Sequence, residues 1–372
     1  MNIAIVHDEL MRRGGAEQVV LCFHKAFPQA PIYTMAYQPN HTYPEFKSCD
    51  IRTSLFQKVV SNEKSMKKLF FPFGVIAMKL LDLTKFDVIL ISSTYAAKYV
   101  KISPNALVIN YCYTPFRLAW NPESYAEYNN TSGIKRTIFD VIIKILRKID
   151  FKAAQRTDYF IAMTNETKER IQKAYLPTNK IELIKPPVNC NKFYISSEIK
   201  DYYLVVSRLE YYKKVDLVIE AFNKLGYPLI IVGRGSKESE LKKMAKPNIV
   251  FKNGLSNEDI AKLYAECKAF IFPQHEDYGI TPLEANASGR PVIAYGQGGV
   301  LDTMIPYTND SNIATALFFE KQEVDYLIEA VLLSENIKFN SNFIRHHAEK
   351  FHEDIFVDEI KSFVLKKINE SK

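Results

Sequence analysis

The sequence predicts an α/β protein with two doubly wound domains, each a parallel sheet with helices on both faces. Short apolar, β-branched runs alternate with amphipathic segments along most of the chain, which is typical of such sheets. The alternation stops once, in a polar segment with two prolines at residues 184–201, which we interpret as a linker. The length of 372 residues also fits two domains of roughly 100–200 residues each.

The expected boundaries follow from that interruption. We expect an N-terminal domain at residues 1–190 and a C-terminal domain at residues 191–350. Residues 351–372 should form a helix that packs back on the N-terminal domain, because residues 352–368 have one apolar face. Two doubly wound domains are expected to face each other across a cleft, with ligands bound beyond the carboxyl ends of the strands.

The individual elements follow from local signals. In the first half we expect strands at residues 2–6, 86–93, 106–113 and 158–163, and helices at 14–27 and after Thr164, which is a good N-cap. In the second half we expect strands at 202–207, 228–233, 248–254, 269–273 and 291–295. The helix at 215–225 should end at Gly226, and Ser256 should cap the helix that follows it.

Composition narrows the class of protein. The net charge of +7 comes without a long basic block, so no nucleic-acid partner is expected. The five cysteines include no C-x-x-C pair, which argues against disulfides and cysteine zinc sites and favours a cytoplasmic location. We see neither a basic region before a long apolar stretch nor 18 uncharged apolar residues in a row, so neither a signal peptide nor a membrane-spanning helix is predicted.

Two glutamates mark a candidate site in the segment from Pro273 to Gly299. Glu276 lies in the loop after the strand at 269–273. Thr281, Pro282 and Glu284 fit a capping box, with Thr281 as N-cap and Glu284 at the third helical position. Glu284 is therefore either a helix cap or an acceptor for the two hydroxyls of a ribose. Glu276 is either a solvated loop acid or a ligand of sugar hydroxyls.

Cations follow the strand at 202–207. Arg208 and Lys213 lie five residues apart in a strand-to-helix turn, where they are either two solvated, exposed loop cations or partners of a pyrophosphate. The glycine-rich loop at residues 296–299 and the N-terminus of the helix after Glu276 offer backbone amides to the same phosphates.

Together these motifs resemble the family-4 retaining glycosyltransferases of the GT-B fold, in particular the subgroup that includes O-antigen mannosyltransferases. The resemblance extends in order along nearly the whole chain, through residues 12–20, 91–98, 111–125, 207–217 and 276–303. It implies two Rossmann-like domains. It assigns the chemistry of transfer to Glu276, Arg208 and Lys213, and donor binding to a larger set: Glu284, Gly14, Gly15, Gly279, Ile280, Thr281, Gly298 and Gly299.

The resemblance also implies acceptor-side residues, namely Tyr95, Tyr113 and Arg117. The subgroup often has histidines where this chain has Tyr95 and Tyr113, and a tyrosine cannot carry a proton near neutral pH as imidazole can. Asp302 stands where a glutamate is usual.

The implied activity is transfer of a hexosyl unit, with retention, from a nucleotide diphosphate sugar to a glycan or lipid-linked glycan acceptor. A mannosyl unit from GDP-mannose is the first expectation, in the synthesis of surface polysaccharide such as lipopolysaccharide. No D-x-D motif is present, so no metal and no cofactor beyond the sugar nucleotide is expected. A nucleotide-sugar epimerase of similar fold and a non-catalytic sugar-nucleotide-binding protein are the alternatives. A dehydrogenase is less favoured because no full G-x-G-x-x-G occurs.

Two segments suggest contact with the inner face of the cytoplasmic membrane. Lys64, Lys67 and Lys68 lie beside the phenylalanines of residues 70–73, and residues 134–152 are basic and amphipathic. Such segments bind anionic lipid, or they are core helices with solvated basic faces.

Overall fold

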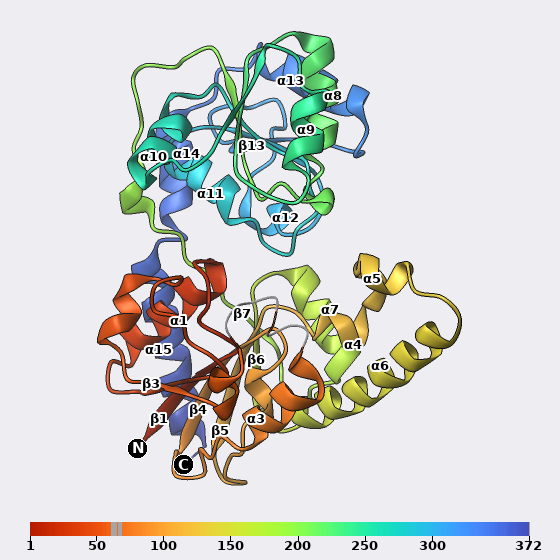
Figure 1. Ribbon diagram of the computed structural model, residues 1–372. Coiled ribbons are helices and arrows are strands. Elements are labelled where there is room, and N and C mark those ends of the chain that lie inside the picture. Colours follow the sequence, from red (N-terminus) through yellow and green to blue (C-terminus); the bar gives the residue numbers. More distant parts are fainter. Residues whose placement is uncertain (61–64, 66–68, 372) are drawn as a thin grey trace. The chain divides into compact units, whose positions relative to one another are not determined.

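The structure, a computed structural model, describes residues 1–371 except 61–64 and 66–68. The chain forms two compact units (Figure 1). Unit 1 comprises Met1–Pro187 and Phe356–Lys372, and unit 2 comprises Val188–Ile355. Each unit contains one parallel sheet. The predicted fold class is confirmed.

Unit 1 contains a seven-stranded sheet in the order β3-β2-β1-β4-β5-β6-β7, with every pair parallel. The order reverses between β1 and β4, so the loops that leave these two strands diverge at a switch point, where doubly wound sheets bind ligands. The strands are β1 (Ile3–His7), β2 (Ile32–Thr34), β3 (Ile51–Thr53), β4 (Val88–Ser93), β5 (Leu107–Cys112), β6 (Tyr159–Ala162) and β7 (Glu182–Leu183).

Helices cover this sheet. They are α1 (Gly15–Ala26), α3 (Val75–Lys79), α4 (Arg117–Trp120), α5 (Ala126–Asn129), α6 (Gly133–Ala154), α7 (Asn165–Tyr175) and α15 (Glu353–Glu370). The C-terminal helix α15 belongs to unit 1 from Phe356 onwards. The ring of Phe356 stacks on that of Phe23 in α1 at 6.1 Å between centroids and meets that of Tyr111 in β5 edge-on at 5.9 Å. All three rings are buried, so the last segment of the chain completes the core formed by the first.

Unit 2 contains a six-stranded parallel sheet in the order β10-β9-β8-β11-β12-β13. Its strands are β8 (Tyr203–Val206), β9 (Leu229–Val232), β10 (Ile249–Lys252), β11 (Phe270–Phe272), β12 (Val292–Tyr295) and β13 (Ala316–Phe319). Its helices are α8 (Val215–Leu225), α9 (Glu238–Met244), α10 (Asn257–Glu266), α11 (Ile280–Ala287), α12 (Val300–Thr303), α13 (Val324–Ser334) and α14 (Ser341–Glu349).

Three of the predicted helix signals are confirmed. The Thr164 side chain accepts a hydrogen bond from the Thr167 amide at the start of α7. Ser256 and Asp259 form a reciprocal capping box on α10. Gly226 ends α8 with φ +72°, a conformation that glycine adopts without strain.

The predicted linker is mostly part of unit 2. Arg345 of α14 donates through Nη1 to the carbonyls of Cys190, at 3.0 Å, and Phe193, at 2.8 Å. Arg290 donates to the carbonyl of Ser196 at 2.7 Å. The two arginines thus satisfy three backbone carbonyls in a segment that has no strand or α-helix. These hydrogen bonds fix residues 190–196 on unit 2.

Among the described residues, no helix is both long enough and apolar enough to span a bilayer. Lys64, Lys67 and Lys68, which contribute to the expected membrane contact, lie outside the described residues.

Candidate active site

The loop that carries Glu276 is held by close backbone contact with the glycine-rich loop after β12. The Gly299 amide donates to the Glu276 carbonyl at 2.8 Å. A Cβ on Gly298, whose φ is +79°, would lie 2.4 Å from that same carbonyl oxygen, and one on Gly299 would lie 2.4 Å from the Tyr278 Cα. Both glycines are needed because any side chain would push the two loops apart.

A second pair of glycines positions the loop of Arg208. A Cβ on Gly233, just after β9, would lie 1.8 Å from the Ser207 carbonyl oxygen, and one on Gly235 would lie 2.2 Å from that of Leu209. In the sequence these two glycines form only an incomplete dinucleotide-binding motif, which does not reveal this role. The signal for this role is the G-x-G directly after β9, because β9 lies next to β8, the strand that precedes Arg208.

The two predicted cations and Glu276 come together in unit 2. Lys213 forms an ion pair with Glu276, and their side chains are 11% and 23% exposed. Arg208 donates to the Tyr212 hydroxyl at 2.5 Å, and the Lys213 ammonium lies 5.2 Å from the centre of the Tyr212 ring. Tyr212, which the sequence did not single out, therefore lies between the two cations.

The expectation of two exposed loop cations is correct for Arg208 and wrong for Lys213. Arg208 is exposed, but Lys213 ends a 3₁₀ turn, Tyr211–Lys213, and is buried. The next residue, Lys214, has φ +53° and begins α8. This left-handed residue reverses the chain direction, so Lys213 points inward toward Glu276 while Lys214 continues into the helix.

The capping box predicted around Glu284 is wrong. Helix α11 begins at Ile280, and its N-cap is Gly279, with φ +87° and no side-chain cap. Thr281 and Pro282 are therefore the second and third helical residues, and Glu284 is the fifth. A glycine can enter the helix from a left-handed conformation, and proline is tolerated in the first turn, where the N–H groups have no helical partner. Glu284 is thus not a helix cap.

Glu284 is instead a desolvated carboxylate with one hydrogen bond from the protein. The Tyr264 hydroxyl of α10 donates to Glu284 Oε2 at 3.0 Å. Burial raises the pKa of Glu284, which the Tyr264 hydrogen bond and the positive charge of Lys192 partly offset. A carboxylate kept in this state gains from further hydroxyl donors. Of the two interpretations of Glu284, the structure favours the ligand.

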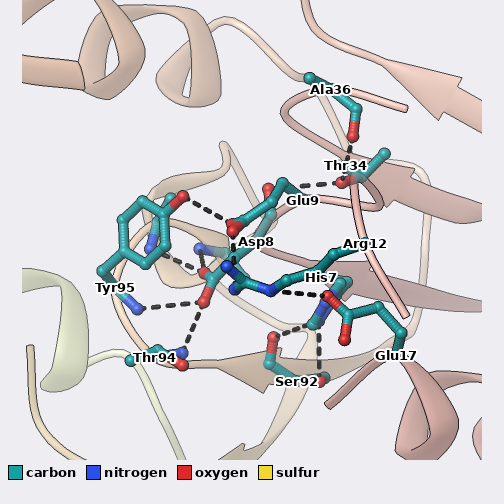
Figure 2. A network of polar contacts seen from close by, with 12 residues as sticks. His7, Asp8, Glu9, Arg12, Glu17, Thr34, Ala36, Ser92, Thr94 and Tyr95 are labelled. Atoms are coloured by element: carbon teal, nitrogen blue, oxygen red, sulfur yellow. Dashed lines mark hydrogen bonds and ion pairs between the residues drawn. The ribbon is translucent and has the colours of Figure 1, made fainter. Parts of the chain in front are cut away.

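In unit 1, Asp8 connects the ends of β1 and β4 at the switch point (Figure 2). Its carboxylate accepts hydrogen bonds from four successive amides, those of Thr94 at 2.6 Å, Tyr95 at 3.2 Å, and Ala96 and Ala97 at 2.7 Å each. All of its acceptor sites face backbone donors, so Asp8 is a structural anchor that fixes the expected acceptor-side loop.

The neighbouring residue, Glu9, forms the polar centre of this cluster in unit 1. Tyr95 donates its hydroxyl to Glu9 Oε2 at 2.6 Å, and Arg12 Nη2 donates to Oε1 at 3.0 Å (Figure 2). Arg12 Nε also lies 3.4 Å from Oε1 of Glu17. Burial raises the pKa of Glu9 to about 8 despite the charge of Arg12. Sequence analysis missed Glu9, although an acidic pair directly after the first strand was a visible signal.

The remaining predicted residues of unit 1 surround this centre. The Tyr113 hydroxyl shares a hydrogen bond with Ser92 Oγ at 2.9 Å and donates to the Ala16 carbonyl at 3.2 Å. Gly14 is the N-cap of α1, and Gly15 is its first residue. Arg117 begins α4 and is exposed. The hydroxyls of Tyr95 and Tyr113 thus contact protein groups, which positions them without requiring a substrate.

Comparisons with known proteins agree with this arrangement. Residues 192–349 match the family described as glycosyl transferases group 1. O-antigen chain mannosyltransferase C of Escherichia coli is 28% identical over 42% of this chain and 43% of its own length. Alpha-1,3/1,6-mannosyltransferase ALG2 of Dictyostelium discoideum is 24% identical over 82% of this chain and 84% of its own. The first of these relatives is thus matched over less than half of its length.

Solved structures define the fold. HepE of Anabaena in complex with UDP superposes with a TM-score of 0.72 over 98% of this chain and 100% of its own, at 14% identity. Sucrose-phosphate synthase of Thermosynechococcus elongatus gives the same TM-score over 100% of both chains, at 15% identity. The two parallel-sheet units therefore have the GT-B glycosyltransferase fold. Residues 192–349, which make up most of unit 2, therefore resemble a glycosyl transferases group 1 domain.

The raised pKa of Glu9 predicts a pH-dependent stability. Between the ordinary pKa of 4.5 and about 8, the folded carboxyl keeps a proton that the unfolded chain has lost, so its contribution to stability falls as pH rises. Glu9→Gln removes this titration. We expect the variant to gain stability relative to the unchanged protein between about pH 5 and about pH 8, and the difference to level off above that. Urea unfolding over a pH series measures this.

The exposed Glu45→Gln serves as the control for the charge change in the same unit. A stability difference between Glu9→Gln and the unchanged protein that is constant or falls with pH would contradict the raised pKa.

Proposed function

We propose that this protein transfers a hexosyl unit, with retained configuration, from a nucleotide diphosphate sugar to a glycan or lipid-linked glycan acceptor. The observation that carries the proposal is the Lys213–Glu276 ion pair, which lies beside Arg208 and Tyr212 at the carboxyl edge of the six-stranded sheet. The mannosyltransferase relatives support mannose as the donor sugar, with GDP-mannose as the first donor to test. The O-antigen relative supports a role in surface polysaccharide synthesis.

The difficult step in such a transfer is the build-up of negative charge on the departing diphosphate. Arg208 and Lys213 would neutralise that charge, and the amides at the N-terminus of α11 and at Gly298 and Gly299 would donate to the phosphates. Because these groups are fixed by backbone contacts before the donor arrives, they need little reorganisation during the reaction.

Glu276 would position the sugar. Its ion pair with Lys213 orients the side chain, and sugar hydroxyls can donate to the remaining acceptor sites of the carboxylate. Lys213 would then bridge the sugar-binding acid and the diphosphate. Glu276 is thus assigned to positioning rather than to covalent attack on the sugar.

The acceptor half of the proposal rests on unit 1. The loop held by Asp8 would present Tyr95 to the acceptor, and the segment after β5 would present Tyr113 and Arg117. A lipid-linked acceptor would bring the enzyme to the inner face of the cytoplasmic membrane, in contact with anionic lipid.

We also propose that transfer requires no metal ion, because Arg208 and Lys213 would take the role of a metal clamp on the diphosphate. Transfer that persists in excess chelator would support this proposal. Activity that is restored only by magnesium or manganese would contradict it.

Glu284→Gln tests the nucleotide site. A ribose diol that donates two hydrogen bonds to a carboxylate loses one acceptor when glutamine replaces it. We expect affinity for the preferred nucleoside diphosphate to fall by about 10- to 150-fold, as for the loss of one charged hydrogen bond. Calorimetric titration of GDP and UDP measures this.

Tyr264→Phe is the matched control, because it removes the protein partner of Glu284 and leaves the carboxylate in place. We expect the control to bind the nucleotide far better than Glu284→Gln does. Equal affinity in Glu284→Gln and the unchanged protein would remove Glu284 from the donor site.

Arg208→Ala and Lys213→Ala test the leaving-group role. We expect each to lower kcat by about 10²-fold or more, as for the removal of one preorganised donor. The change in Arg208 should leave the melting temperature nearly unchanged because that side chain is exposed. Lys213→Ala should lower the melting temperature as well as kcat, because Glu276 loses its ion-pair partner.

Lys224→Ala removes an exposed cation of α8 elsewhere in unit 2 and should retain normal turnover. Product analysis with and without acceptor completes the test. Interconversion of free sugar nucleotides without an acceptor would identify an epimerase instead.

A further inference from the structure

Unit 1 contains a cationic cavity that the transfer reaction does not use. It has a volume of about 340 Å³ and lies between the C-terminal end of α3, the C-terminal half of α6 and the segment at residues 99–101. Four of its lining residues are basic: Lys79, Lys101, Lys152 and Arg156. Its residues precede the strands β4, β5 and β6, whereas the candidate active-site residues of unit 1 follow β1, β4 and β5. The cavity is therefore a separate feature of this unit.

The positive charge of this cavity is only partly compensated. Lys101 forms an ion pair with Asp82 at 2.6 Å. Arg156 donates to the carbonyls of Val100, at 2.9 Å, and Lys98 rather than to a carboxylate. Burial lowers the pKa of Arg156. Among the residues described, none of those that line the cavity is acidic. An anion bound in the cavity would be stabilised by these basic side chains.

The outer face of α6 is apolar where an ordinary surface helix is polar. Ile134, Ile138, Val141 and Ile145 follow one another at spacings of three or four residues, which places them on one face, and they are between 42% and 81% exposed. The opposite face, with Ile143 and Leu146, packs into the core of unit 1. The helix is thus apolar on both sides, and its outer stripe is unpartnered among the described residues.

The apolar stripe leads into the cavity. The same spacing continues from Ile145 to Ile149 and Lys152, both of which line the cavity. On the other side of the cavity, Ile76 of α3 and Leu80, directly after this helix, are exposed beside Lys79. Figure 1 shows α3 and α6 on the same unit. The helix α6 has two acidic residues, Asp140 and the buried Asp150, and six basic ones. The basic residues are Lys135, Arg136, Lys144, Arg147, Lys148 and Lys152.

A free phosphate would need the cations but not the flanking apolar side chains. Exposed apolar surface beside a basic pocket fits a membrane, where the side chains enter the acyl boundary and the cations meet the phosphates. We propose that this cavity binds the phosphate of an anionic phospholipid headgroup, while the exposed apolar faces of α3 and α6 enter the same membrane surface. This inference deepens the membrane contact in the proposed function and gives it a definite site.

Vesicle binding by the full chain tests the cavity. We expect the unchanged protein to sediment with vesicles that contain phosphatidylglycerol and phosphatidylcholine, and not with phosphatidylcholine alone. Lys79→Gln with Lys152→Gln should lower binding by about fivefold for each lysine. The exposed pair Lys47→Gln with Lys173→Gln makes the same charge change elsewhere in unit 1 and should bind nearly as well as the unchanged protein. Ile138→Ser with Ile145→Ser should also weaken binding, because it removes the apolar contact.

Each contrary result has a distinct meaning. If the cavity and control variants bind equally, the cavity is not a phosphate site, although the membrane contact stands. If the unchanged protein ignores anionic vesicles at low salt, both the cavity proposal and the membrane contact fail. If inorganic phosphate raises its melting temperature and vesicles do not bind, the ligand is free phosphate and the lipid assignment is wrong. Calorimetric titration of GDP and UDP in the same variants tests the transferase proposal separately, and we expect it to be unaffected.

Discussion

Close contact between backbone segments at the carboxyl edge of the six-stranded sheet is the constraint on which the candidate donor site depends. The loops that carry Arg208 and Glu276 lie outside the strands and α-helices of unit 2. Each is fixed by a neighbouring loop whose glycines approach so closely that a Cβ would overlap a carbonyl oxygen or a Cα atom. Glycine is used here because only a residue without a side chain allows two backbones to approach within this distance. The cations and the acid are thus positioned before any ligand binds.

The carboxylates of the candidate sites in the two units have different surroundings, which suit them to different tasks. Asp8 accepts four backbone amides and has no acceptor site left, so its role is to hold a loop. Glu276 is compensated by a lysine, whereas Glu284 receives one tyrosine hydroxyl and is otherwise desolvated. Glu9 is buried so deeply that its pKa rises to about 8 even beside an arginine. These differences separate anchors from groups that can accept hydrogen bonds from a ligand.

Unit 1 combines this polar centre with a basic and apolar outer surface on separate parts of its fold. The loops after β1, β4 and β5 carry the polar groups, while α3 and α6 carry exposed isoleucines, leucine and lysines. A helix that is apolar on two opposite faces lowers the solubility of the protein unless another surface covers its outer face. That cost supports a functional interpretation of the outer face of α6 rather than a merely structural one.

The sequence by itself determined the two parallel sheets, because buried strands read as continuous apolar runs and the helices between them have a period near 3.6. It also predicted which loops would carry the donor site, since Arg208, Lys213 and Glu276 follow strands of unit 2 and Glu284 lies in the helix after Glu276. Only the tertiary structure decided the rest. The start of α11 depends on the positive φ of Gly279, which gives no local signal distinct from that of any glycine, so the cap at Thr281 was wrongly predicted. The burial of Lys213 and the pairing of Glu9 with Tyr95 join residues far apart in the chain, and the cationic cavity gathers its residues from separate segments. No local pattern encodes such contacts, because they arise only when the sheet brings distant loops and helices together.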